Sequence, residues 1–410
     1  MNAPGPDAWL LAAHDDVATA VRALAAGARV EVRYGDAVRE TTLVDAIPAG
    51  HKFALRPLAA GLRIRKYGEY IGKTTCAVAA GAWVHEHNLA TSARRPPDLE
   101  RAWGEAAPAR IVGTLGRTRC ALGESPVWDA REGRLWFVDL RDTPAIHALH
   151  PVHGTEQRWS MPEDIGCIVP GSDGVLVAGL RSGFATFDPA SGALDYFLDP
   201  EPGRATNRLN DGKCDAHGRL WCGSMNPDSA LAEGSLYALE GRARCTRVLD
   251  EWLTPNGIAW SPDARTMYVA DTRRGTIDAF AFDADEGTLS ARRVFADLAA
   301  LAGGPDGACV DREGCLWSAI FDGGALLRLT PDGRIDRVVR MPVSKPTSCA
   351  FGGDDYRTLF VTTASRGLSA SRLAAEPLAG RVLALDVGVA GFAPDAFAPI
   401  REVRACLAAK

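Results

Sequence analysis

The sequence predicts an all-β protein in which a six-bladed β-propeller follows a small, turn-rich β domain. Two observations support this fold class: a repeat that fills most of the chain after residue 110, and alternating strand patterns bounded by glycines near the N-terminus. Each of six repeats contains an apolar strand, a turn rich in Asp and Gly, and a second strand. The repeats align on Trp136, Leu176, Trp221, Tyr268, Trp317 and Phe360, which stand 40, 45, 47, 49 and 43 residues apart.

A repeat of this length with several short strands per unit is typical of a β-propeller, whose blades are four-stranded sheets around an axis. Six copies predict six blades. Residues 380–386 form one further predicted strand, which we expect to close the ring against residues 110–115. A β-sandwich and an open solenoid are the alternatives, but neither requires so regular a count.

Residues 1–91 form the predicted N-terminal domain. Asp15 to Gly27 has the pattern of a short capped helix that ends at a glycine. The predicted strands that follow lie within residues 29–33, 47–55, 61–67 and 83–88. Residues 92–109 carry proline and charge without β periodicity and are predicted to be a linker, so that the propeller spans 110–402.

The composition limits the possible functions. Of the 410 residues, 47% are hydrophobic and 24% are charged, as in a folded globular protein, and the formal net charge of −5 gives no basic footprint for nucleic acid or an anionic membrane. The N-terminus lacks a secretory signal pattern and no apolar run is long enough to span a membrane, so we expect a cytoplasmic protein whose partner is a small molecule. The ten cysteines contain no Cys-x-x-Cys pair and are predicted to be reduced and mostly buried.

Polar residues recur at one position of the repeat. The residue that opens the first strand is Glu124, Ile165, Asp211, Asn256, Asp306 or Thr347, and each is followed by Gly or Ser. In a propeller these positions meet at the mouth of the central channel, where grouped carboxylates repel unless a cation neutralises them. Oxygen ligands of this kind suit Ca²⁺, Mg²⁺, Mn²⁺ or Zn²⁺. The alternative is that Asp and Asn precede glycine only to form turns, a role that glutamate does not share.

Histidines offer two further candidate sites. His85 and His87 would leave the same face of a strand, as a metal pair or an anion site requires, but we favour a polar sheet edge as the explanation of the spacing. His147, His150 and His153 lie in a turn-rich stretch, which we interpret as an exposed loop rather than a zinc site.

The N-terminal motifs resemble those of a known domain. Ile47-Pro-Ala-Gly-His-Lys, Lys66-Tyr-Gly with Ile71-Gly-Lys, and His85-Glu-His-Asn88 occur in the order found in the SAF-type (β-clip) domain of altronate and galactarate dehydratases, over about residues 14–91. The large catalytic domain of those dehydratases has no counterpart here. The resemblance therefore implies a link to sugar-acid metabolism rather than dehydration by this chain alone.

Residues 110–400 resemble the SMP-30/gluconolactonase/luciferin-regenerating family. The motifs that carry this resemblance are Gly123-Glu-Ser-Pro-Val-Trp128, Asn207-Arg-Leu-Asn-Asp-Gly-Lys213, Gly234-Ser-Leu-Tyr237, Pro255-Asn-Gly-Ile-Ala-Trp-Ser261, Pro305-Asp-Gly307 and Pro346-Thr-Ser-Cys-Ala-Phe-Gly-Gly353. The family is a six-bladed propeller with one divalent metal ion on its axis, and many members hydrolyse sugar lactones.

The resemblance also implies roles for single residues. It implies that Glu124, Asn256 and Asp306 bind the metal ion. It further implies that Arg208, Asn210 and Asp211 face the substrate, with Glu233 as a further candidate, while Lys213 and Lys345 are either supporting or surface residues. Asp306 is our hypothesis for the general base; the alternative is a metal-bound hydroxide with Asp306 only as a ligand.

The expected function is that of a carboxylic-ester hydrolase: metal-dependent opening of a sugar lactone. Gly-x-Ser-x-Gly is absent, which argues against a serine nucleophile. Two alternatives stay open: a non-enzymatic protein that binds a divalent metal or a sugar acid, and an accessory component of a sugar-acid dehydratase. The sequence identifies neither the lactone, the metal nor the oligomeric state.

Overall fold

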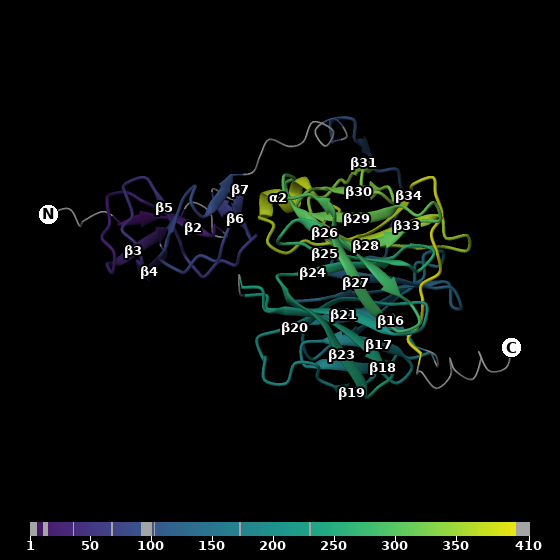
Figure 1. Ribbon diagram of the computed structural model, residues 1–410. Helices are drawn as coiled ribbons and strands as arrows, with labels where there is room; N and C mark the ends of the chain where they lie inside the picture. The colour runs from purple at the N-terminus through teal and green to yellow at the C-terminus, as the bar shows by residue number, and fades with distance from the viewer. Residues whose placement is uncertain are drawn as a thin grey trace. The chain divides into compact units, whose positions relative to one another are not determined.

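The computed structural model describes residues 6–10, 15–35, 37–66, 69–91, 101, 103–171, 174–228 and 231–398. The chain divides into two compact units, one of Met1–Pro96 with Asp228–Ala232 and the other of Pro97–Pro227 with Glu233–Lys410. Both are built from β-strands, and the larger unit includes the short helix α2 (Ala370–Ala375) (Figure 1). No helix in the described residues has the length and hydropathy that crossing a bilayer demands.

The strands of the first unit are β1 (Ala8–Trp9), β2 (Val17–Ala20), β3 (Arg29–Tyr34), β4 (Ala37–Thr42), β5 (Lys52–Ala54), β6 (Arg63–Lys66), β7 (Glu69–Thr74), β8 (Trp83–Val84) and β9 (Leu89–Thr91). They form a six-stranded sheet in the order β4-β3-β1-β2-β5-β8 and a three-stranded sheet in the order β6-β7-β9. The predicted alternation is clear in β3, where Val30 and Val32 are buried and Arg29 and Glu31 are exposed. The first unit is therefore the small β domain that the sequence predicts.

The helix predicted over residues 15–27 is wrong. Residues 17–20 form β2, which pairs antiparallel with both β1 and β5. Asp16 does not cap a helix, because its carboxylate accepts a hydrogen bond of 2.7 Å from the backbone N–H of Arg65 and pairs with Arg56. Pairing with two neighbouring strands thus outweighs the local helical pattern of this Ala-rich segment.

The strands of the larger unit are β10 (Ala107–Pro108), β11 (Ile111–Leu115), β12 (Gly123–Asp129), β13 (Arg134–Asp139), β14 (Ala145–Leu149), β15 (Glu156–Ser160), β16 (Ile165–Pro170), β17 (Leu176–Leu180), β18 (Gly183–Asp188), β19 (Ala193–Leu198), β20 (Arg208–Cys214), β21 (Leu220–Met225), β22 (Gly234–Glu240), β23 (Arg244–Trp252), β24 (Pro255–Trp260), β25 (Thr266–Asp271), β26 (Thr276–Asp283), β27 (Thr288–Asp297), β28 (Gly304–Val310), β29 (Leu316–Phe321), β30 (Ala325–Leu329), β31 (Ile335–Arg340), β32 (Pro346–Gly352), β33 (Thr358–Thr363) and β34 (Val382–Asp386). They form sheets in the orders β12-β13-β14-β15, β16-β17-β18-β19, β20-β21-β22-β23, β24-β25-β26-β27, β10-β31-β30-β29-β28 and β11-β34-β33-β32.

One end strand of each sheet contacts the end strands of two other sheets. We call these six strands, β12, β16, β20, β24, β28 and β32, the first strands of their sheets. β12 contacts β16, β16 contacts β20, β20 contacts β24, β24 contacts β28, β28 contacts β32, and β32 contacts β12. The expected pairing of the last strand with the segment near residue 110 is observed, because β34 pairs antiparallel with β11 and brings Thr114 opposite Leu383. The first strand of every sheet therefore has neighbours from two other sheets.

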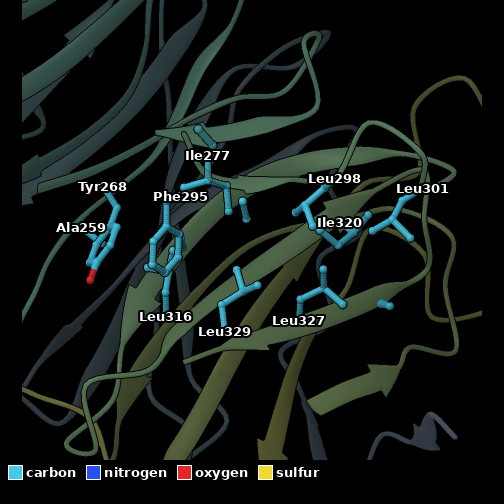
Figure 2. Close-up of a cluster of buried hydrophobic side chains, with 14 of the residues drawn as sticks. Ala259, Tyr268, Ile277, Phe295, Leu298, Leu301, Leu316, Ile320, Leu327 and Leu329 are labelled. Atoms are coloured by element: carbon cyan, nitrogen blue, oxygen red, sulfur yellow. The ribbon is translucent and has the colours of Figure 1, made fainter. Parts of the chain in front are cut away.

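Apolar side chains fill the space between consecutive sheets. Figure 2 shows the core between the β24–β27 sheet and the β28–β31 sheet, where Tyr268 and Phe295 lie with ring centroids 4.7 Å apart. Leu316, Leu327 and Leu329 complete this layer and are fully buried. Burial of such faces on both sides of each sheet explains the runs of apolar residues in the repeat.

The end of the predicted linker is structured. Residues 92–100 and 102 lie outside the described residues, but Ala107–Pro108 form β10, which pairs parallel with β31. Trp103 is 7% exposed and belongs to the same core, with the Arg340 guanidinium 4.6 Å from its ring centroid. Packing of Trp103 attaches this segment to the larger unit. The prediction of a linker did not take this packing into account.

Histidine and cysteine positions differ in how well the sequence predicts them. His147, which was predicted in an exposed loop, is buried on β14 and stacks on Phe137 at 4.8 Å, whereas His150 and His153 do lie in the following turn.

Among the described cysteines, Cys120, Cys167, Cys214, Cys222, Cys309, Cys315 and Cys349 are buried free thiols. Cys406 lies outside the described residues.

Candidate functional site

The candidate site lies at the start of the first strand of each sheet in the larger unit. Glu124, Asp211, Asn256 and Asp306 lie on β12, β20, β24 and β28. A β-bulge or irregularity interrupts the pairing of each first strand near this point. Because a bulge changes the direction of a side chain and ends regular pairing, these positions can present polar groups that a regular strand would point into the core.

The glycines that follow the polar residues are required by close packing between strands. At Gly257 φ is +59°, and a Cβ atom there would lie 2.7 Å from the backbone oxygen of Asp306. A Cβ atom on Gly307 would lie 2.0 Å from Oγ of Ser348. Both glycines lie within strands, so the alternative that Asp and Asn precede glycine only to form turns is wrong.

Three carboxylates act on one another at this site. Asp306 is 5% exposed, and Glu124 and Asp211 are partly buried. Burial, with Asp211 next in effect, raises the pKa of Glu124 to about 8. Burial and the neighbouring Glu124 and Asp211 raise the pKa of Asp306 well above its usual range. The cluster therefore favours a bound proton or a bound cation over full ionisation.

A chain of hydrogen bonds joins the amides of Asn210 and Asn256 to Thr272 and to the backbone of Pro305. Nδ2 of Asn210 donates to the backbone oxygen of Pro255 at 2.9 Å and to Oδ1 of Asn256 at 2.6 Å. Nδ2 of Asn256 donates to Oγ1 of Thr272 at 2.8 Å, and that hydroxyl donates to the backbone oxygen of Pro305 at 2.7 Å. The chain fixes the Asn256 amide so that its oxygen faces Asn210.

Arg208 is a buried cation beside the acids. Its guanidinium donates to Oδ1 of Asn210 at 2.6 Å and to the backbone oxygen of Leu209 at 3.0 Å. Burial lowers the pKa of Arg208 to about 10, with Arg141 next in effect. Arg208 therefore keeps its positive charge at neutral pH, and Asp164 and Glu124 act on it in the opposite direction to burial.

The remaining predicted residues lie apart from this cluster. Oε2 of Glu233 accepts a hydrogen bond of 2.7 Å from Asn226, and its backbone oxygen accepts from Asn207 at 3.1 Å. Nζ of Lys213 donates to the backbone oxygen of Ala308 at 2.5 Å. Nζ of Lys345 lies 3.0 Å from Asp322 and 4.6 Å from the ring centroid of Phe321. The two lysines thus have structural partners within the larger unit.

Sequence reasoning missed three residues at this end of the sheets: Arg141, Arg181 and Thr272. Each lies four or five residues after Trp136, Leu176 or Tyr268 in the repeat alignment, directly beyond the second strand of its sheet. The same offset would have found them. Their residue types differ, however, so a search for one recurring side chain passes over them.

A cavity of ≈ 320 Å³ opens beside Arg208. Its lining includes Arg181, Ser182, Glu201, Arg204, Asn207 and Arg208. A volume of this size accommodates a small sugar, and the lining offers charged and hydrogen-bonding groups.

The histidines of the first unit do not lie on one strand face. β8 ends at Val84, and residues 85–88 form a turn in which Oδ1 of Asn88 accepts from the backbone N–H of His85 at 2.9 Å. The ring of His85 stacks on His51 at 5.1 Å and lies 6.5 Å from that of His87. The strand assumption behind the predicted metal pair or anion site is therefore wrong.

Comparison with known proteins identifies the family. A family model described as the SMP-30/Gluconolactonase/LRE-like region matches residues 122–365, more than half of the chain. The chain belongs to the SMP-30/gluconolactonase/LRE-like family. Residues 7–92 match a second model, the Altronate/galactarate dehydratase SAF domain. Both predicted resemblances are thereby confirmed.

Several members of the SMP-30/gluconolactonase/LRE-like family are similar over nearly their whole length. The 6-deoxy-6-sulfogluconolactonase of Pseudomonas putida is 37% identical, over 69% of this chain and 97% of the relative. The structure of a calcium-binding protein, regucalcin, from Agrobacterium tumefaciens matches with a TM-score of 0.68 at 28% identity, over 72% of this chain and 99% of that chain. The structure of a gluconolactonase from Xanthomonas campestris matches with a TM-score of 0.55 at 25% identity, over 69% and 95% of the two chains.

The donor set at the site fits a divalent metal ion. Within the described residues, no group of three His, Cys, Asp or Glu side chains is placed to hold a metal ion. The predicted set of Glu124, Asn256 and Asp306 combines two carboxylates with one amide. Burial and the neighbouring carboxylates raise the pKa values of Glu124 and Asp306, so a nearby cation would favour their ionised forms. Hard oxygen ligands of this kind suit Ca²⁺, Mg²⁺ or Mn²⁺ and also bind Zn²⁺.

Proposed function

We propose that this protein hydrolyses a sugar-acid lactone to the free acid, with one divalent metal ion held on the axis of a six-bladed β-propeller. The observation that carries the proposal is the group of mutually repelling carboxylates at the start of the first strands, beside a buried arginine and a polar cavity. The ring of contacts among the first strands supports the propeller, and the relatives named as lactonases support the reaction.

Glu124, Asn256 and Asp306 are the proposed ligands of the metal ion. Three protein oxygens leave room for water and substrate, and a bound divalent cation would polarise the lactone carbonyl and stabilise the negative charge that develops on its oxygen. Asn210 positions the Asn256 ligand, because both of its N–H groups are donated to Pro255 and Asn256.

Asp306 is the proposed general base. Its carboxylate takes a proton from the attacking water. Arg208 supplies a positive charge and Asp211 a partly buried carboxylate that already accepts a hydrogen bond of 3.1 Å from the backbone N–H of Ile258. These two residues orient the polar groups of the substrate, and Glu233 is a further candidate for contact with it.

A single assay tests this proposal. Metal-stripped protein is mixed with a panel of aldonic and aldaric lactones, and acid release is followed with a pH indicator after Ca²⁺, Mg²⁺, Mn²⁺ or Zn²⁺ is restored in turn. We expect turnover above spontaneous hydrolysis with at least one cation, and loss of that turnover in Asp306→Ala. Metal binding without turnover of any lactone would instead support a non-enzymatic binding protein.

A further inference from the structure

An arginine group lies beside the proposed lactonase site. It consists of Arg141 directly beyond β13, Arg181 directly beyond β17, and Arg208 at the start of β20. Arg208 is 5% exposed, and the positive charges of Arg141 and Arg181 both act on it. Guanidinium groups from three sheets therefore lie near enough to affect one another, and two of them, Arg181 and Arg208, line the same cavity.

Three arginines face two acids in this group: Asp164 pairs with two of them, and both Asp164 and Glu124 act on Arg208 through their charges. The carboxylate of Asp164 pairs with both Arg141, at 3.0 Å, and Arg181, at 3.3 Å. Arg208 donates only to neutral oxygens and to Sδ of Met225 at 3.5 Å, and its Nε has no hydrogen-bond partner among the described residues. Because a buried guanidinium without a paired anion is unfavourable, this arrangement favours the binding of an anion.

The nearby Glu201 does not supply that anion. Its Oε1 accepts hydrogen bonds from Ser224 at 2.8 Å and Tyr237 at 2.9 Å, and its Oε2 accepts from Asn207 at 3.0 Å. Arg204 lies 3.6 Å from the same carboxylate. Both carboxylate oxygens of Glu201 therefore already accept hydrogen bonds from other residues. Arg181 and Arg208 line the cavity without forming an ion pair with Glu201.

We infer that the lactone carries its own acidic group, separate from the ring ester, and that Arg181 and Arg208 bind this group in the ≈ 320 Å³ cavity while the ester carbonyl meets Glu124, Asn256 and Asp306. This inference rests on the proposed function and narrows its substrate class to anionic lactones, such as those of dicarboxylic sugar acids. A planar guanidinium binds a carboxylate or a sulfonate through two parallel hydrogen bonds, which gives both affinity and orientation. Arg141 is a positioning residue, because it shares Asp164 with Arg181.

Two lactones that differ in one group test the inference. D-Glucaro-1,4-lactone carries a carboxylate where D-glucono-1,4-lactone carries a hydroxymethyl group. With the wild-type holoenzyme we expect kcat/KM to be at least tenfold higher for the acidic lactone. Arg181→Gln should lower kcat/KM for the acidic lactone about tenfold through KM and leave the neutral lactone nearly unchanged, since one charge-assisted hydrogen bond corresponds to roughly this factor. Arg181→Lys should restore part of the loss.

The control variant is Arg242→Gln, which removes an exposed arginine in the turn between β22 and β23 that pairs with Asp195 at 2.6 Å. It should leave both lactones unaffected. Equal kcat/KM for the two lactones, with no change in Arg181→Gln, would overturn the inference while leaving the lactonase proposal intact. If neither lactone is hydrolysed, the proposed function fails. Calorimetric titration with sugar acids then tests separately whether the arginine group binds an acidic group. Binding of D-glucarate but not D-gluconate, lost in Arg181→Gln, supports an acid-binding site, and equal binding overturns it.

Discussion

Gly257 shows how closely single residues are constrained at the site. It has a φ of +59°, and its Cα approaches the backbone oxygen of Asp306 so closely that no side chain fits. Gly257→Ala would therefore both strain the backbone and move Asp306. We expect a loss of about 1–3 kcal/mol in the free energy of unfolding and weaker binding of the metal ion.

Urea denaturation and calorimetric titration with Ca²⁺ measure these two effects. Gly241→Ala is the matched control, because Gly241 has a φ of +62° but no atom within 4 Å of an added Cβ. The control should lose stability through backbone strain alone and keep its metal affinity. Equal metal affinity in Gly257→Ala and the wild type would contradict the proposed ligand role of the neighbouring Asn256 and Asp306.

His147 makes stability depend on pH. Burial lowers the pKa of His147 from 6.5 to about 4, although Glu156 lies 3.5 Å away and acts in the opposite direction. The unfolded chain therefore binds this proton more tightly than the folded chain, so stability is full above pH 6.5 and is lost as the pH falls from 6.5 to 4. The loss is about 3 kcal/mol at most, at about 1.4 kcal/mol for each unit of pKa.

The measurement is the urea midpoint of the wild type and of His147→Phe between pH 7 and pH 4. Phenylalanine keeps the stacking on Phe137 but cannot titrate, so its midpoint should fall less steeply over this range. His150→Gln, in the turn that follows, should behave like the wild type. Parallel pH dependences of the wild type and His147→Phe would show that another group is responsible.

Prediction from sequence succeeded best for residues whose place follows from the repeat. Counting back from Trp221 or Trp317 locates Asp211 and Asp306 on β20 and β28, because each sheet repeats the same path, although they are the fourth and third residues of these strands rather than the first. Arg141 and Arg181 escaped notice because they follow the second strand, where the repeat keeps a position but not a residue type. The chemical roles of the site residues stay predictions.

At the scale of elements, the buried Asp311 stabilises the turn between β28 and β29 through hydrogen bonds. Oδ1 of Asp311 accepts hydrogen bonds from the backbone N–H groups of Glu313 and Cys315, both at 3.0 Å. Its Oδ2 accepts from Nε1 of Trp317 at 2.9 Å and from Nε of Arg328 at 2.8 Å. Asp215 holds Trp221 in the same way in an earlier sheet, with Nε1 to Oδ2 at 2.9 Å.

Asp311→Ala should cost about 2–4 kcal/mol in the free energy of unfolding, because it leaves an indole N–H and part of a buried guanidinium without partners. Thermal and urea unfolding measure the change. Asp332→Ala is the control, since Asp332 is an exposed turn residue that pairs with Arg334 at 2.6 Å, and its loss should change stability by less than about 1 kcal/mol. A similar effect in both variants would show that the buried network contributes little.

The elements also show where local patterns mislead. Asp15 to Gly27 has an acidic start, several alanines and a terminal glycine, which together indicate a helix. In the structure Val17, Ala18 and Ala20 are buried in a strand between β1 and β5. The sequence of these thirteen residues does not show which distant strands will pair with them. Tertiary contacts therefore decide between helix and strand here.

At the scale of the whole molecule, each of the two units has its own hydrophobic core. The core of the first unit includes Val30, Val32 and Phe53, whereas the proposed ligands Glu124, Asn256 and Asp306 all lie in the larger unit. We therefore predict two thermal transitions, of which a divalent cation raises only the one that belongs to the larger unit. At a concentration of 100 times its Kd, the cation should stabilise that unit by about 2.7 kcal/mol.

Differential scanning calorimetry with and without Ca²⁺ measures both transitions. Asp306→Ala is the control for the metal effect and should leave the first transition unchanged. One transition that moves as a whole on addition of the cation would show that the two units unfold together.

The sequence predicts the two-part organisation because each part repeats or alternates with a clear period. It does not predict that Trp103 and Ala107–Pro108 pack onto the larger unit, since a short strand and one aromatic side chain lack periodicity. Long-range pairing of this kind depends on the completed fold rather than on neighbouring residues.

Such long-range pairing has a consequence for biosynthesis. β11 and β34 lie side by side in one sheet, although they stand near the two ends of the larger unit. While the ribosome is still translating, the edge of β33 that later receives β34 is unpaired, and so is β11. Exposed strand edges of this kind pair readily with other chains. A transcript cut short before residue 382 should therefore yield aggregates rather than a smaller folded protein.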